Sequence, residues 1–97
     1  MSIRNDAYQL VAGGSKVITV ATAEATDTVV ISEDYVLSTN TDCFVRFSGS
    51  AVAGTDNNFD LFMPAGSIAV LRATNTTIRV IRATADGLLG ISRLEVV

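Results

Sequence analysis

Side chains that could carry out acid–base, nucleophilic or metal chemistry are few in this sequence. There is no histidine, and Cys43 is the only cysteine. No imidazole is therefore present to activate the thiol, and no second thiol is present to form an intramolecular disulfide. The adjacent carboxylates Glu33 and Asp34 would point to opposite sides of an extended chain, so we expect no cooperation between them in acid–base catalysis. We expect no catalytic residues and a protein that is not an enzyme.

Two short motifs are superficially similar to ligand-binding loops. Residues 56–60, Asp-Asn-Asn-Phe-Asp, offer oxygen atoms to calcium but lack the glycine and terminal glutamate of an EF-hand, so we expect a polar turn. Gly13-Gly14-Ser15-Lys16 lacks the glycine spacing of a phosphate loop and precedes an expected strand, so we predict a hairpin turn there. No metal or cofactor is expected.

Composition favours an all-β fold. Val, Ile and Thr supply 30 of the 97 residues, and such side chains fit a pleated, half-buried surface. Glycine, proline and asparagine punctuate the chain, and Asp86-Gly87 is a second hairpin signal. Cys43 is expected inside, as a small apolar group. The predicted strands are Tyr8–Val11, Lys16–Ala21, Thr28–Ser32, Tyr35–Ser38, Cys43–Ser48, Phe59–Met63, Ile68–Arg72, Thr77–Arg82 and Leu88–Val96.

The length fits one domain. We expect residues 1–14 to form an N-terminal arm and a first short strand, and residues 15–97 to form a single β domain. The expected architecture is a single antiparallel β-sandwich, jelly-roll-like, or a small β-barrel.

The chain is unusually apolar for its size. The hydrophobic fraction is 48% and the mean hydropathy is +0.41. No apolar run reaches the roughly 18 residues of a membrane helix, and the first ten residues lack the apolar core of a secretory signal. The extra apolar surface could be buried in a subunit interface, although alanine residues account for part of the high hydropathy. Apolar and polar residues do not alternate cleanly in Thr77–Arg82 and Leu88–Val96. This pattern indicates a bulge near Ser92-Arg93 or burial of both faces of the sheet.

Charge is distributed unevenly. Residues 1–42 carry six carboxylates and two cations, whereas residues 43–97 carry five arginines and four carboxylates. The acidic half argues against nucleic-acid binding. Arginine on a sheet face can pair with a partner's carboxylate, or can simply be solvated over a buried stem. The N-terminal segment is either a frayed end or an arm that orders on a neighbour. The interface candidates are Arg46, Arg72, Arg79, Arg82, Arg93, Ile3 and Arg4.

Three motifs over residues 16–96 carry a family resemblance. They are Phe44-Val45-Arg46-Phe47 before a loop of small residues, Pro64-Ala65-Gly66, and the closing segment from Ala83 to Ser92. In this order they resemble small structural proteins of tailed bacteriophages. The sequence departs from the pattern at Ser48 before Gly49 and at Asp86-Gly87, where a threonine-glycine pair is common.

The resemblance implies a virion component, most plausibly a capsid decoration (cement) protein on the head exterior, made in the bacterial host cytoplasm. Its expected partners are the major capsid protein and copies of itself, with a trimer favoured over a dimer, and neither nucleic acid nor membrane. A neck or tail accessory protein is the alternative within virions. A host- or carbohydrate-binding module is a further alternative, although such modules usually display aromatic platforms and this chain has no Trp.

Overall fold

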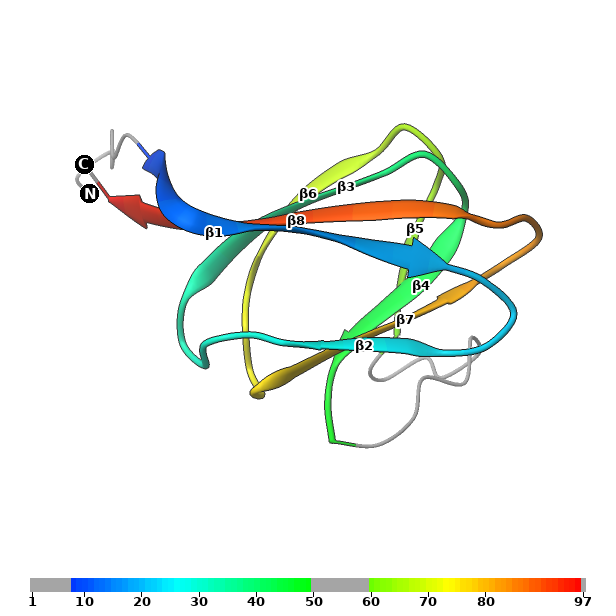
Figure 1. The fold of residues 1–97 in the computed structure, drawn as a ribbon, viewed down its shortest axis with the longest axis horizontal. Helices are drawn as coiled ribbons and strands as arrows, with labels where there is room; N and C mark the ends of the chain where they lie inside the picture. The colour runs from blue at the N-terminus through cyan, green and yellow to red at the C-terminus, as the bar shows by residue number, and fades with distance from the viewer. Residues whose placement is uncertain (1–7, 50–59, 97) are drawn as a thin grey trace, which may run out of the picture.

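The computed structural model describes residues 8–49 and 60–96, which fold into two antiparallel four-stranded sheets (Figure 1). Sheet A has the strand order β1-β8-β3-β6 and sheet B has the order β2-β7-β4-β5. The strands are β1 (Tyr8–Val20), β2 (Ala25–Thr28), β3 (Asp34–Thr39), β4 (Cys43–Phe47), β5 (Leu61–Met63), β6 (Ile68–Arg72), β7 (Thr77–Arg82) and β8 (Gly87–Val96). The described part of the chain contains no helix, so it holds none that could span a membrane.

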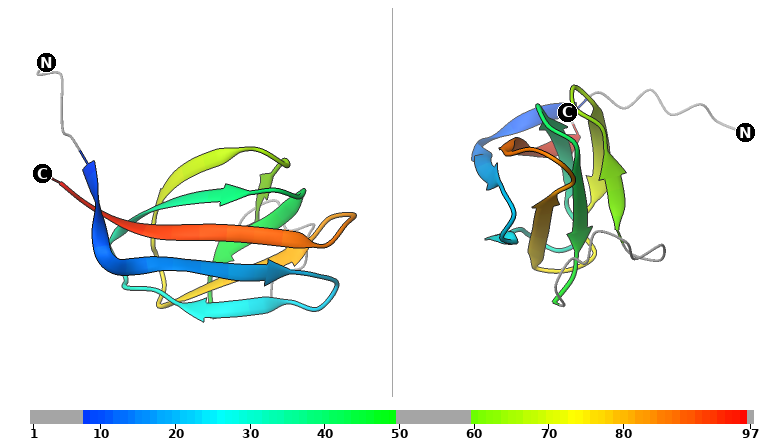
Figure 2. Two further views of the ribbon diagram at one scale, coloured as in Figure 1. Left: turned by 45° about the horizontal axis from the view of Figure 1, so that its top comes forward. Right: turned by 90° about the vertical axis from the view of Figure 1, so that its right-hand side faces the viewer.

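Strand pairing defines a jelly roll. The first strand pairs with the last, β2 with β7, β3 with β6, and β4 with β5, all antiparallel. This is the pairing of one long hairpin, and rolling it up brings β8 beside β3 and β7 beside β4. Figure 2 shows the two layers from two directions, and β1 and β8 lie side by side in the layer formed by sheet A. The predicted all-β, jelly-roll-like sandwich is confirmed.

The core is formed by every second side chain along the strands. Along β3, Tyr35 and Leu37 point between the sheets, while Val36 and Ser38 face outward. The facing strand β4 buries Cys43 and Val45 in the same way. The core consists of Ile18, Val20, Val29, Tyr35, Leu37, Cys43, Val45, Met63, Ala73, Ile78, Val80, Leu89 and Ile91.

Cys43 lies inside as predicted, with no exposed surface. Its Sγ donates a hydrogen bond of 3.7 Å to Oγ1 of Thr39. Burial raises the pKa of this thiol, and the nearby charge of Asp42 adds to the effect against the opposing hydrogen bond to Thr39. The thiol is therefore held neutral as a core group.

Two of the predicted turns connect the sheets. Pro64-Ala65-Gly66 is the predicted turn, with Gly66 at φ 83°, and it leads from β5 in sheet B to β6 in sheet A. Asp86-Gly87 was expected to close a hairpin, and this is wrong because β7 and β8 belong to different sheets. A Cβ at Gly87 would lie 2.5 Å from Oδ1 of Asn40, so close packing against the loop after β3 requires glycine.

The predicted hairpin at Gly13-Gly14 is also wrong, because both glycines lie inside β1. Between Leu10 and Ser15 the register with β8 shifts, so that four residues of β1 stand opposite Arg93 alone. Gly13 has φ 74°, and the left-handed conformation that makes tight turns also makes bulges. The irregularity predicted near Ser92-Arg93 is present, but its extra residues belong to β1, whereas β8 keeps a continuous register with β3.

One predicted strand is displaced. The chain pairs over Ala25–Thr28, not over Thr28–Ser32, because β2 follows the edge of β7 and the chain then turns toward β3. Ser32 has φ 69° in that turn, and its backbone N–H donates to the carbonyl of Ala73. The apolar Val30 and Ile31, which suggested a strand, are left about half exposed in this connection.

Candidate functional site

The outer face of sheet A carries several of the exposed large apolar side chains in the described part of the chain. We use this name for the outward-facing positions of this sheet at Ser15, Val17, Thr19, Asp34, Val36, Ser38, Ile68, Val70, Arg72, Leu88, Gly90 and Ser92. Ile68 is 72% exposed, Val17 is 68% exposed and Val70 is 57% exposed. Asp34 and Arg72 are the charged residues of this face, and they pair with each other at one end, with Arg72 Nε 3.0 Å from Asp34 Oδ1. Such a surface is typical of one that another protein covers.

Register gives this face a defined relief. One row across the four strands reads Val17, Gly90, Ser38 and Ile68, with large side chains on the edge strands and small ones between them. The next row reads Ser15, Ser92, Val36 and Val70, in which Val36 is only half exposed. Small residues therefore occupy the two middle strands in the first row, whereas Val36 in the second row and the exposed Leu88 on β8 are larger.

Sheet B carries two of the predicted arginines side by side. Arg46 on β4 and Arg79 on β7 are direct cross-strand partners on the outer side of sheet B. Arg46 Nε lies 2.7 Å from Asp60 Oδ1, and Arg79 Nη1 lies 2.6 Å from Glu24 Oε1. Like charges in opposite positions destabilise a sheet. The two carboxylates offset that repulsion, so both arginines serve the fold of this chain.

The remaining candidates are not brought together. Arg72 pairs with Asp34, and Arg82 pairs with Asp86 at 2.7 Å. Arg93 lies on the inner side of sheet A, opposite Tyr35, and makes no hydrogen bond or ion pair in the part of the chain that the structure describes. Ile3 and Arg4 lie outside the described residues, as does most of the oxygen-rich segment 56–60. The arginines named as interface candidates are therefore dispersed over both sheets.

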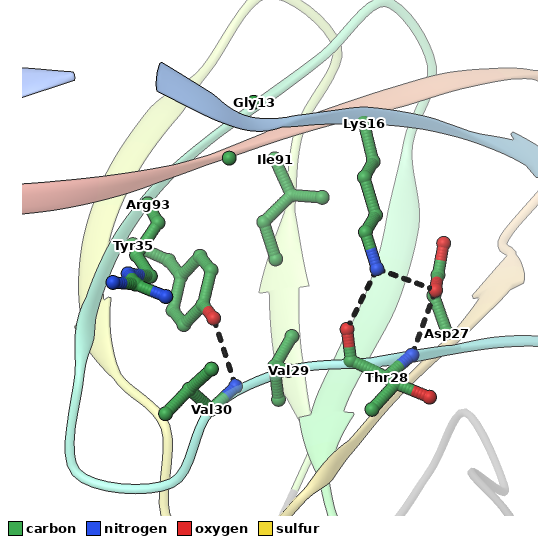
Figure 3. Close-up of a pocket in the computed structure, with 10 residues that line it drawn as sticks. Gly13, Lys16, Asp27, Thr28, Val29, Val30, Tyr35, Ile91 and Arg93 are labelled. Carbon is green, nitrogen blue, oxygen red and sulfur yellow. Dashed lines mark hydrogen bonds and ion pairs between the residues drawn. The ribbon is translucent and has the colours of Figure 1, made fainter. Parts of the chain in front are cut away.

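A cavity of about 240 Å³ opens at the end of the sandwich beside Arg93 (Figure 3). Its walls come from the β1 bulge at Gly13 and Gly14, from Ile91 on β8 and from the segment that follows β2. On one side of it, the hydroxyl of Tyr35 accepts a hydrogen bond of 2.8 Å from the N–H of Val30 (Figure 3).

On the opposite side of the cavity, Lys16 ties β1 to β2. Its Nζ donates to Asp27 Oδ1 and to the carbonyl oxygen of Thr28, both at 3.0 Å. The same carboxylate accepts a 2.7 Å hydrogen bond from the N–H of Thr28. Burial by itself would raise the pKa of Asp27, but the hydrogen bonds from Lys16 and Thr28 and the charge of Lys16 outweigh it and lower the pKa.

Among the described residues, no group of three or more cysteines, aspartates and glutamates is placed to hold a metal ion. Sequence reasoning looked for charged interface residues and missed the outer face of sheet A. The available signal was Ile68–Arg72, where four apolar residues in succession leave neither side of the strand polar.

Comparisons with known proteins add little to this picture. No protein-family model matches the sequence, and no curated protein is significantly similar to it. Two solved structures align with 99% of the chain at 16% identity and a TM-score of 0.48. One is a cupin-2 domain containing protein from Shewanella frigidimarina, of which 76% is covered, and the other is a Bacillus endospore appendage from a family of disulfide-linked pili, of which 92% is covered. Likeness at this level carries no conclusion about function.

Proposed function

We propose that this chain is a non-enzymatic structural subunit that assembles through the outer face of sheet A, and specifically a capsid decoration protein of a tailed bacteriophage. The observation that carries the first part is the exposure of Val17, Ile68 and Val70 on a face whose charged residues are one terminal ion pair. The phage assignment rests on the sequence resemblance. A shell-reinforcing protein needs contacts to several subunits and no reactive groups.

Covering this face would be favourable. Burial of apolar area stabilises by roughly 25 cal/mol per Å², and association costs offset much of that gain for a single contact. A symmetric oligomer repeats the contact and engages the shell at several points at once, so its copies bind with avidity. We propose that neighbouring copies of this chain cover the outer face of sheet A.

The relief of the face favours three copies over two. Strands lie about 4.8 Å apart, so a four-stranded sheet is about 14 Å wide. In a trimer whose three sheets form the walls of a triangular prism, the middle of each sheet would then lie about 4 Å from the threefold axis. The residues nearest the axis must then be small, and Gly90 and Ser38 in the row of Val17 and Ile68 meet this condition. Larger side chains belong in the corners, where Val17 of one copy would meet Ile68 of the next. A face-to-face dimer would set the large edge residues of this row against each other and leave a gap over Gly90 and Ser38.

Oligomeric state tests the proposed face directly. Sedimentation equilibrium of the purified chain should give the mass of a trimer. Ile68→Lys should shift the mass toward that of the monomer, because a charge would have to be buried in a corner. Ile31→Lys is the matched control, since Ile31 is also an exposed isoleucine, 51% accessible, but lies outside this face. A monomeric wild-type protein, or equal effects of the two variants, would refute the assembly surface.

Position in the particle tests the phage assignment. Purified protein added to phage heads that lack it should bind in hundreds of copies and raise the temperature at which the heads break open. About a dozen copies or fewer would indicate the neck or tail instead. Saturable retention on a glycan array, with no binding to heads, would support a carbohydrate-binding module and contradict the proposal.

A further inference from the structure

Arg93 has an unusual position for an arginine. It lies on the inner side of sheet A, directly across from the buried Tyr35, and its guanidinium projects beside the Tyr35 ring at the cavity described above (Figure 3). Its Nε is buried and has no hydrogen-bond partner within the described residues. An arginine stays protonated in proteins and presents five N–H donors, so a buried donor without an acceptor carries a desolvation penalty.

The sequence around Arg93 keeps this arrangement in place. Four residues of β1 bulge past Arg93, and a Cβ at Gly14 would lie 3.1 Å from the Cβ of Arg93 and 3.0 Å from the carbonyl oxygen of Val11. The glycine therefore lets β1 pass close to the stem of Arg93. Gly13 and Gly14 of the bulge line the cavity together with the segment after β2.

The charges around the cavity favour an anion. Its lining includes Arg93, Lys16 and Asp27, which together carry one net positive charge in a chain whose net charge is −3. Lys16 is engaged by Asp27, which leaves Arg93 as the lining cation without a carboxylate partner among the described residues. The rest of the lining includes Val29, Val30 and Ile91, which suit an apolar group.

We infer that the cavity beside Arg93 binds a carboxylate attached to a small apolar group. Arginine pairs with carboxylates through two parallel N–H···O bonds, and the Arg93 guanidinium has no carboxylate partner among the described residues. The volume of about 240 Å³ is below the usual range for drug-sized ligands, so the apolar group is short. This inference does not depend on the proposed function, because the cavity is on the inner side of sheet A and the assembly face is on its outer side.

The carboxylate could come from a free small acid or from an acidic side chain of a neighbouring copy. Both sources present the same group to Arg93, so one set of probes can separate them. Hexanoate is a suitable probe for the free acid, and hexanamide has the same carbon chain without the charge. The Arg93 Nε–H signal in a ¹H–¹⁵N spectrum reports directly on the donor that lacks an acceptor.

With hexanoate, the Nε–H signal of Arg93 and the amide signals of Gly13 and Gly14 should shift and saturate, whereas hexanamide should bind at least tenfold more weakly. Arg93→Met should abolish the hexanoate effect, and Arg93→Lys should weaken it, since lysine keeps the charge but loses the planar fork. Arg82→Met removes an arginine remote from the cavity and should bind hexanoate as the wild type does. The comparison of hexanoate with hexanamide uses unmodified protein, so the test stands even if the Arg93 variants fold poorly.

Sedimentation of the same samples separates the two sources. Hexanoate binding without a change in oligomer mass would support a free acid as the ligand. A lower mass, caused both by hexanoate and by Arg93→Met, would support a carboxylate supplied by a neighbouring copy. Equal responses to hexanoate and hexanamide, or no response of the Arg93 signal together with an unchanged mass in Arg93→Met, would overturn the inference.

Discussion

The ion pair between Arg46 and Asp60 offers the sharpest test of how sheet B is stabilised. Arg46 projects from the outer side of β4, yet only 5% of its side chain is exposed, and Asp60 is 3% exposed. Their 2.7 Å contact is therefore shielded from water, and Arg46 also stands directly across from Arg79. Removing the Asp60 carboxylate would take away this buried contact, while Arg46 would still stand across from the second cation, Arg79.

The expected cost is large for a domain of this size. Breaking a buried ion pair by removing one partner destabilises by about 3–5 kcal/mol. A small domain has a total stability of about 5–15 kcal/mol, so Asp60→Leu should remove about a fifth or more of it. With a urea m-value of about 2 kcal/mol/M, the unfolding midpoint should fall by about 2 M. The double variant Arg46→Met with Asp60→Leu should recover much of this loss, because an apolar pair carries no desolvation penalty.

Urea unfolding followed by far-ultraviolet circular dichroism measures all four members of this cycle. Arg82→Met is the control, because the Arg82–Asp86 pair is exposed and should contribute at most about 1 kcal/mol. Our account would be refuted if Asp60→Leu and Arg46→Met each cost no more than this control and if their effects were additive in the double variant.

Three further predictions concern other parts of the fold. Gly87→Ala should destabilise the fold by about 1–3 kcal/mol because its Cβ would overlap Asn40. Gly49→Ala is the control, because a Cβ there meets no atom within 4 Å and should leave the unfolding midpoint nearly unchanged. Equal effects of the two variants would contradict the close packing at Gly87. Cys43 should not react with a thiol reagent in the native protein at about pH 8 and should react fully in denaturant; rapid native labelling would contradict its burial. Asp27 has a folded-state pKa below its ordinary value of 3.8, so its stabilisation is present above that pH and is lost as the pH falls through the lowered pKa. Asp27→Asn should therefore lower the urea midpoint more at neutral pH than at acidic pH, and a constant difference across this range would contradict the assignment.

The candidate surfaces were only partly predictable. The composition correctly indicated surplus apolar surface, but the five arginines of residues 43–97 were expected to mark it. In the structure, Arg46 and Arg79 instead pair with Asp60 and Glu24, because their positions on neighbouring strands require compensation within the chain. A cation's partner can lie far away in sequence, so spacing alone does not reveal it.

The sequence by itself determined the strand class, most strand positions, the burial of Cys43 and the turn at Pro64-Ala65-Gly66. These depend on side-chain shape, alternation and glycine or proline geometry, which are local properties. Tertiary structure alone decided that Gly13 and Gly14 form a bulge within β1, because a left-handed glycine serves a bulge as well as a turn and only the pairing with β8 selects between them. It also decided that Val17 and Ile68 share one exposed face and that Arg93 faces a cavity, because strand order brings together residues that no local pattern relates.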